Sequence, residues 1–251
     1  MLDVLDGLVL PIIQKVFQIL AEPVQGTDDE LAHTNLRAAY LSFLASIMGA
    51  RLDAVFLSPT NKPELENILT NVASFTTEYG DPICQKLAFS ILARTVVAWA
   101  FNPAVPRIAL AGPVYLGVGP EAKILPTTQV IPGFEAYIYD RLLPLCFEVP
   151  SNAAFRPKDG QSQLVMAEIA TLFRSIVFAR GQEALDRLQN GYLPSLGCPP
   201  ATAADFVTQL TTLESKNFRR WFTDFVKSAR DAQEAAQKAA RDALKEQQQQ
   251  R

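Results

Sequence analysis

One segment, residues 81–101, constrains the fold of this chain more than any other, because it reads as a helix that is apolar around most of its circumference. Its polar residues Lys86, Ser90 and Arg94 recur every four positions and form a single narrow polar stripe. The segment opens with Asp-Pro, which supplies an N-cap and a proline at the first helical position. A helix with so little polar surface must be covered by neighbouring helices on two sides.

Helical periodicity recurs along most of the remaining chain, and no stretch shows the strict alternation of apolar and polar residues that is typical of a strand. Hydrophobic residues make up 49% of the 251 residues, which is enough to bury a sizeable core. The chain is therefore predicted to be all-α. Besides the helix at 81–101, helices are predicted over residues 28–48, 63–79, 134–149, 160–180, 181–195, 203–212 and 214–245.

Three prolines share one local context, because each follows a leucine in or at the end of an apolar helix. They are Pro11 in LVLPIIQKVF, Pro144 in RLLPLCF and Pro194 in GYLPSLG. A HEAT or armadillo helix pair has ~40–47 residues. The interval from Pro11 to Pro144 is about three such repeats, and the interval from Pro144 to Pro194 is about one. A proline inside a helix costs about 3 kcal/mol, so its recurrence predicts helices bent around a curved stack. The predicted architecture is an α-solenoid of four to five HEAT-type antiparallel helix pairs.

Two regions depart from this pattern. Residues 102–133 carry six of the 17 prolines, which predicts an irregular insertion over 102–131 within one repeat. Residues 230–251 are rich in alanine and glutamine and predict an exposed, fraying helical tail. The expected organisation is therefore a set of repeats over 1–229 followed by this tail.

Charge and motifs argue against several classes of function. The net charge of −3 argues against a free-standing nucleic-acid binder, whose domain is usually strongly basic, while local basic patches remain compatible with it. The single histidine, His33, rules out a two-histidine metal site. Gly117, Gly119 and Ala122 match a GxGxxA pattern, but a dinucleotide site needs a preceding strand, and a proline-rich loop surrounds them. We expect no enzymatic activity, no cofactor and no metal.

The cysteines and the N-terminal segment indicate the cellular setting. The apolar run at 7–20 contains Pro11 and Lys15 and is too short to span a bilayer, so no membrane partner is expected. The chain opens directly in a helix, which suggests a piece of a longer protein. Three widely spaced cysteines fit a reducing compartment and are expected to be small buried residues: Cys84, Cys146 and Cys198.

Four strings of residues carry a resemblance to a known family. In chain order they are LRAAYLSFL (36–44), EYGDPICQKLAFSIL (78–92), PGFEAYIYDRLLPLCFEVP (132–150) and RGQEALDRLQNGYLPSLG (180–197). The combination of DPxxQK, PGFxxYIY, RGxE and YLPSL is more specific than a generic HEAT signature. From about residue 8 to residue 229, the chain resembles the C-terminal part of the exportin-T family of karyopherins.

The resemblance implies part of a nuclear export receptor that carries tRNA to the cytoplasm together with RanGTP. It further implies passage through the nuclear pore by contact with nucleoporins, and a location in both nucleus and cytoplasm. Ran would bind mainly to N-terminal repeats that this chain lacks. The C-terminal repeats would contact the acceptor arm and elbow of tRNA through the backbone, which fits recognition of A-form RNA by shape.

Residues that contact tRNA are expected among the cations of the concave surface, which the second helix of each HEAT pair lines. Arg141 and Arg187 are assigned to such second helices, whereas Lys86 and Arg94 are assigned to an outward-facing first helix with a structural role. In SKNFRRWFTDFVK, the aromatic residues are predicted to face the stack: Phe218, Trp221, Phe222 and Phe225. The cations left on the other side complete the predicted site: Lys216, Arg219, Arg220 and Lys227.

Two alternatives stay open on the sequence alone. The basic residues at 216–227 also fit a solvated helix face that binds nothing. The whole chain also fits a HEAT-repeat scaffold that binds protein partners only. A basic concave face would favour tRNA, and an apolar or acidic groove would favour a protein ligand.

Overall fold

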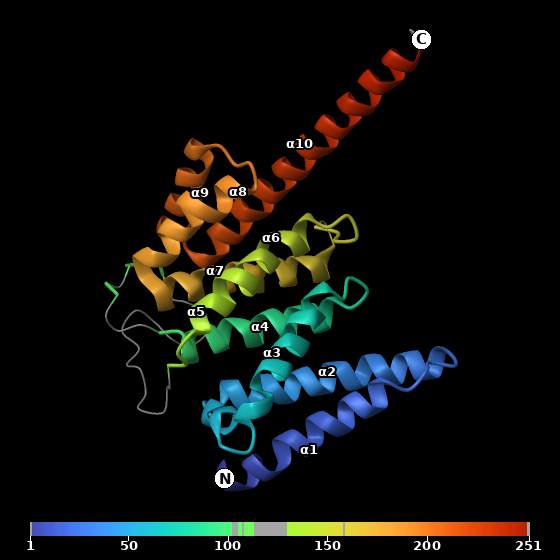
Figure 1. The fold of residues 1–251 in the computed structure, drawn as a ribbon, viewed down its shortest axis with the longest axis vertical. Helices are drawn as coiled ribbons and strands as arrows, with labels where there is room; N and C mark the ends of the chain where they lie inside the picture. The colour runs from blue at the N-terminus through green and yellow to red at the C-terminus, as the bar shows by residue number, and fades with distance from the viewer. Residues whose placement is uncertain (1, 102–104, 107, 113–129, 158, 250–251) are drawn as a thin grey trace.

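The protein is described by a computed structural model over residues 2–101, 105–106, 108–112, 130–157 and 159–249. Within these ranges every regular element is a helix, as predicted, and no strand occurs (Figure 1). The α-helices are α1 (Leu2–Leu20), α2 (Thr27–Gly49), α3 (Leu65–Ser74), α4 (Pro82–Trp99), α5 (Phe134–Tyr137), α6 (Leu143–Ser151), α7 (Gly160–Arg187), α8 (Leu193–Ser195), α9 (Pro200–Thr212) and α10 (Ser215–Gln249). Two π-helical turns, η4 (Ile138–Leu142) and η5 (Leu188–Tyr192), precede α6 and α8.

The helices stack as two rows, with the two chain ends at opposite ends of the stack (Figure 1). In the second row, α4 packs between α2 and α7, and α10 packs on the other side of α7. The first row supplies a preceding partner for three of these helices, since α1 packs on α2, α3 on α4 and α6 on α7. This arrangement confirms the predicted all-α solenoid of HEAT-type pairs.

The two central helices of the second row are covered on more than one side, as the sequence of α4 requires. Ten of the 18 residues of α4 are buried, among them Trp99, which is only 1% exposed, and the polar stripe is half-buried. The helical stretch of residues 160–195 contains an 18-residue window that is apolar enough to cross a membrane, but 72% of this window is buried inside the protein. Its apolarity therefore reflects a central position in the solenoid.

Both π turns explain how the interior prolines are tolerated. Leu143-Pro144 directly follows η4, and Leu193-Pro194 directly follows η5. A π turn inserts one extra residue, which shifts the preceding carbonyls away from the position where the proline ring would clash with them. Pro11 lies instead within the continuous helix α1. The shared context of two of the prolines thus corresponds to a shared local widening of the helix.

Gly181 divides the long α7 into two helical parts. Its backbone has φ +54° and ψ −133°, a conformation that is available essentially only to glycine. A Cβ atom at this position would lie 2.5 Å from the carbonyl oxygen of Pro106 and 2.8 Å from Val105 Cγ1. The predicted boundary between helices at 160–180 and 181–195 is therefore confirmed. Residues 182–195 continue in the first row. There the ring of Tyr192 packs on that of Phe147 of α6, with ring centroids 5.2 Å apart.

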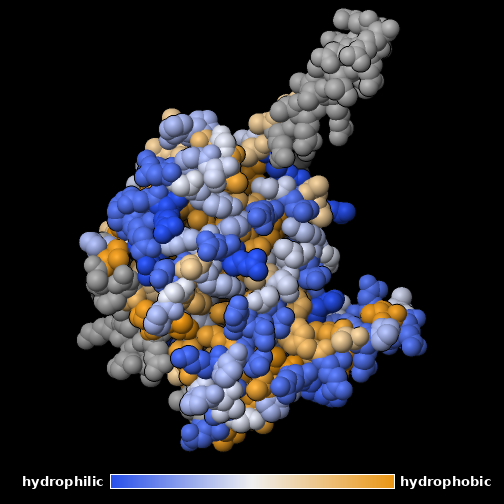
Figure 2. All heavy atoms as spheres, in the orientation of Figure 1, coloured by the Kyte–Doolittle hydropathy of each residue, from blue (hydrophilic) through white to orange (hydrophobic). Residues whose placement is uncertain are grey.

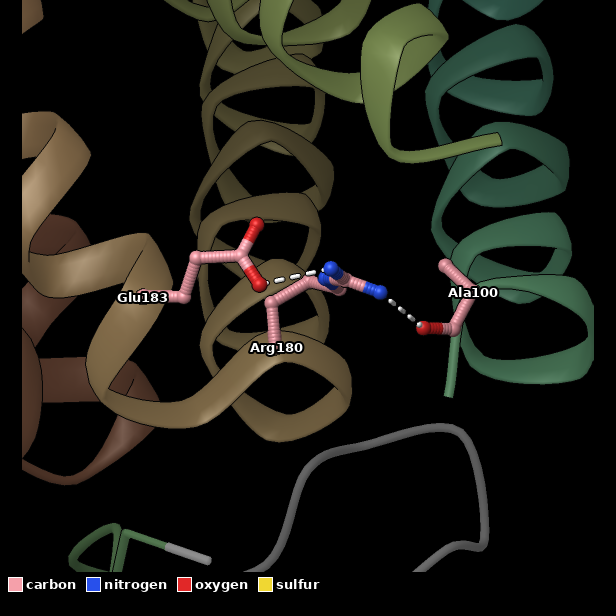
Figure 3. Close-up of polar contacts among 3 residues, drawn as sticks. All are labelled: Ala100, Arg180 and Glu183. Atoms are coloured by element: carbon pink, nitrogen blue, oxygen red, sulfur yellow. Dashed lines mark hydrogen bonds and ion pairs between the residues drawn. The ribbon is translucent and has the colours of Figure 1, made fainter. Parts of the chain in front are cut away.

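The residues around this break tie neighbouring helices together. The Arg180 guanidinium donates to the carbonyl of Ala100, at the end of α4, over 3.3 Å, and forms an ion pair of 2.6 Å with Glu183 (Figure 3). Glu183 follows the break, so the pair spans it. The RGxE string thus joins α4, the break and the start of the next helix in one contact.

A second buried arginine anchors the insertion. Arg174 is fully buried, and its guanidinium donates to the carbonyls of Leu213 (2.8 Å) and Ala111 (2.6 Å). The Ala111 amide donates in turn to the Thr211 carbonyl near the end of α9 (2.9 Å). The described parts of the predicted insertion at 102–131 contain no helix or strand. The remainder, including the GxGxxA match, lies outside the described residues.

The cysteines are free thiols. Cys84 and Cys146 are completely buried, as predicted, whereas Cys198 is only half-buried. Burial raises the pKa of the Cys84 thiol to about 12, so this thiol stays protonated at neutral pH.

We predict that Gly181→Ala lowers the free energy of unfolding by at least about 2 kcal/mol, because the new methyl group meets a backbone oxygen and the left-handed φ strains an alanine. Urea unfolding of the whole chain measures this change. Gly7→Ala is the control: nothing lies within 4 Å of its Cβ position in α1, and alanine there should stabilise the helix by about 0.5–1 kcal/mol. Equal effects of the two substitutions would contradict the prediction.

Candidate nucleic-acid interface

Aromatic packing fixes the orientation of α10. Phe218 and Phe222 are completely buried, and Val226 is 3% exposed. Trp221 and Phe225 are half-buried and pack on Phe206 of α9, with ring centroids 5.4 and 5.3 Å apart. The prediction that these aromatic residues face the stack is therefore confirmed, and the opposite side of α10 is left to its charged residues.

The aromatic cluster under α10 joins both rows of helices. Phe222 lies 5.2 Å from Phe173 of α7 and 6.1 Å from Phe147 of α6, measured between ring centroids. Fully burying one phenylalanine side chain contributes about 1.5–3 kcal/mol, and edge-to-face ring pairs add about 0.5–1.5 kcal/mol each. The start of α10 is thus held rigidly against α7, and the cations on its first turns have a fixed position.

A hollow with a volume of about 440 Å³ lies between α4, α7 and α10. We call it the basic hollow. Three of its lining residues are cations, Arg94 from α4 and Lys216 and Arg219 from α10, and one is the carboxylate Glu168 from α7. The other lining residues are Ser90, Ala167, Thr171 and Ser215.

A fourth cation lies near Glu168, although it does not line the hollow. Lys86 of α4 lies close enough to Glu168 for its charge to lower the pKa of that carboxyl group, as Arg94 and a hydrogen bond from Ser90 also do. Burial has the larger effect, however, and the pKa of Glu168 is raised overall. Two residues of the polar stripe of α4, Ser90 and Arg94, therefore line the basic hollow, and Lys86 lies near its Glu168 wall.

The predicted site residues fall into two groups. Lys216 and Arg219 line the basic hollow, while Arg220 and Lys227 are exposed on α10 and do not line it. Which of these cations contact RNA stays a prediction. Arg141 and Arg187 lie elsewhere: neither lines the hollow.

The pairing of helices corrects the assignment of Arg141 and Arg187. Residues 134–151 and 182–195 belong to the first row, because α6 precedes and packs on α7, and Tyr192 of the second segment packs on Phe147 of α6. Arg187 lies over the ring of Tyr139, 4.9 Å from its centroid, so it links two first-row helices. Helix α4, which was assigned to the first row from the sequence, is in the second row, so its cations share the row on which RNA contacts are expected.

Only part of the basic hollow could be predicted from the sequence. The four-residue spacing of the α4 stripe was visible, but whether it faced solvent or a neighbouring helix depended on the pairing. Glu168 carried no signal, since a single carboxylate in an apolar helix reads as a solvated position. In the part of the chain that the structure describes, no group of three or more histidine, cysteine or acidic side chains could hold a metal ion.

Fold and hollow together define the class of the molecule: an α-solenoid with a basic recess between second-row helices, a form whose extended surfaces serve binding. The family model for Exportin-T matches residues 1–230. The chain therefore belongs to the Exportin-T family.

Individual relatives agree with this assignment. The chain is 38% identical to Exportin-T of Mycosarcoma maydis over 228 residues, which is 91% of this chain and 19% of that protein. It is 37% identical to Exportin-T of Laccaria bicolor (92% and 20%) and 33% identical to that of Emericella nidulans (89% and 21%). The chain thus spans about a fifth of the length of the curated relatives it matches.

We predict that Phe222→Ala lowers the free energy of unfolding by about 3–5 kcal/mol, because it leaves a cavity between α10, α7 and α6 that the ring cluster cannot refill. Urea unfolding followed by circular dichroism gives the value. Leu196→Ala, at a side chain that is 55% exposed, serves as the control and should change stability by less than about 0.5 kcal/mol. A small loss for Phe222→Ala would show that α10 is not seated by this cluster.

Proposed function

We propose that this chain is part of a nuclear export receptor for tRNA, and that it holds the tRNA backbone at the basic hollow. The observation that carries the proposal is the convergence of three lining cations from two second-row helices, Arg94 with Lys216 and Arg219. Lys86 of α4 adds a further positive charge near Glu168. Membership of the Exportin-T family supports it. A tRNA cargo presents a phosphate backbone, and a basic surface on the second row can bind phosphate groups.

The charge distribution favours a local contact over general attraction to nucleic acid. The chain as a whole has a net charge of −3, so its long-range field does not attract a polyanion. Arginine and lysine residues around one recess neutralise a few phosphates at defined positions. Such contacts fix the position of the RNA on the protein without reading its bases. This mode suits a receptor that must accept many tRNA sequences with one backbone shape.

The wider transport cycle belongs to the proposal as well. RanGTP would bind cooperatively with tRNA in the nucleus, mainly through repeats outside this chain, and GTP hydrolysis would release the cargo in the cytoplasm. The receptor would shuttle through the pore by contacting nucleoporins. These steps rest on family membership, and the basic hollow supports only the contact with tRNA.

A specific observation favours a second candidate, a scaffold that binds proteins only. The hairpin of α1 and α2 carries large exposed apolar side chains: Val4, Leu8, Val24 and Leu31, each between 47% and 66% exposed. Hydrophobic residues are visible in the lower half of the molecule, where these helices lie (Figure 2). Such residues suit a protein partner, whereas the basic hollow does not, so a measured affinity for tRNA separates the two candidates.

We predict that the chain binds tRNA weakly at low salt and that binding weakens steeply as salt increases. Neutralising about four phosphates gives a slope of about −3 to −4 in a plot of log affinity against log salt, or a loss of about a hundredfold between 50 and 200 mM. Titration of fluorescently labelled tRNA at several salt concentrations measures the slope. No binding at high micromolar protein and low salt would move the tRNA contact to other parts of the receptor.

We also predict that the double substitution Lys216→Glu, Arg219→Glu weakens tRNA binding at least tenfold at about 0.1 M salt. The matched control is Lys15→Glu, Lys62→Glu, which makes the same change in net charge at two exposed lysines on the α1 side of the molecule. The control should weaken binding no more than about twofold, because exposed charges beyond a Debye length of about 10 Å are screened. Equal losses in both pairs would contradict a localised site.

A further inference from the structure

The basic hollow contains one group that opposes its proposed ligand. Glu168 places a carboxylate on the wall that α7 contributes, among Arg94, Lys216 and Arg219. A phosphate that enters the hollow therefore meets a like charge as well as the cations.

The surroundings of Glu168 show which cations it engages. Ser90 and Arg94 line the hollow together with Glu168, and Lys86, Arg94 and the Ser90 hydroxyl all lower the pKa of its carboxyl group, which favours the ionised form. All three belong to the polar stripe of α4, so the carboxylate faces that helix across the hollow. In the unbound protein, Glu168 thus acts as the counter-charge of the α4 cations, in the place where a phosphate group would otherwise neutralise them.

We propose that Glu168 is a built-in competitor for the phosphate groups of the ligand, which holds the affinity of the basic hollow below the value that its cations alone would give. This inference rests on the proposed function, since it assigns a role within the same tRNA site. Its physical consequence is reversible binding: a receptor that releases its cargo requires a contact that is specific in shape yet limited in strength.

Electrostatics sets the expected size of the effect. Two like unit charges about 7 Å apart, in a partly solvated recess with an effective dielectric constant of about 40, repel by about RT ln 10 or slightly less. Removing the carboxylate charge should therefore strengthen phosphate binding by about three- to tenfold. If Glu168 instead positioned Lys86 and Arg94 for the ligand, the effect would have the opposite sign. Neutralising the carboxylate would then weaken phosphate binding.

The decisive variant is Glu168→Gln, which removes the charge, keeps the shape and can still accept the hydrogen bond from Ser90. The expected result is tRNA binding that is three- to tenfold tighter than in the unsubstituted chain under the same salt conditions. Glu66→Gln, at an exposed position of α3 in the first row, makes the same change in net charge and should alter the affinity by less than twofold. Thermal unfolding of both variants without ligand checks that the fold is retained.

A second readout separates this inference from the proposed function. Inorganic pyrophosphate, added as a small probe, should raise the melting temperature of Glu168→Gln more than that of the unsubstituted chain. If tRNA does not bind at all but pyrophosphate shows this difference, the tRNA function fails and the competitor role of Glu168 stands. If Lys216→Glu, Arg219→Glu weakens tRNA binding while Glu168→Gln leaves it unchanged or weakens it, the function stands and the competitor role is overturned.

Discussion

The packing of α4 against α7 is the contact on which the rest of the structure depends. Each helix is apolar around most of its surface, so neither is stable until the other and a further neighbour cover it. Helix α2 covers the outer side of α4, and α10 covers the outer side of α7. The second row grows from this central pair, and the first row fills the opposite side. A solenoid follows because each added helix buries one face and leaves another to be buried.

Local breaks in the helices let the two rows remain in register. The π turns before Pro144 and Pro194 widen first-row helices where an unbroken α-helix would clash with proline. Gly181 turns the chain from the second row back to the first, and Arg180 fastens this turn to the end of α4 (Figure 3). These positions fall within the strings that first indicated the family, which gives those strings a structural meaning independent of any ligand.

The basic hollow is a consequence of the same packing. The one polar stripe of α4 cannot be buried among apolar neighbours, so it faces the recess that α7 and the first turns of α10 leave open. The aromatic cluster seats α10 and thereby brings Lys216 and Arg219 to that recess. Glu168 completes the recess with an opposing charge. A surface of this composition can attract a phosphate backbone and also release it.

The sequence by itself determined the all-α solenoid, most helix boundaries, the break at Gly181 and the inward orientation of Phe218 and Phe222, because these depend on local periodicity and on backbone preferences. Only the tertiary structure decided which helices form the second row, and the placement of Arg141 and Arg187 depended on that choice. It also decided that Arg94 and Glu168, far apart in the chain, face one hollow. Periodicity shows that a helix has a polar face, but only packing between distant segments determines what that face meets.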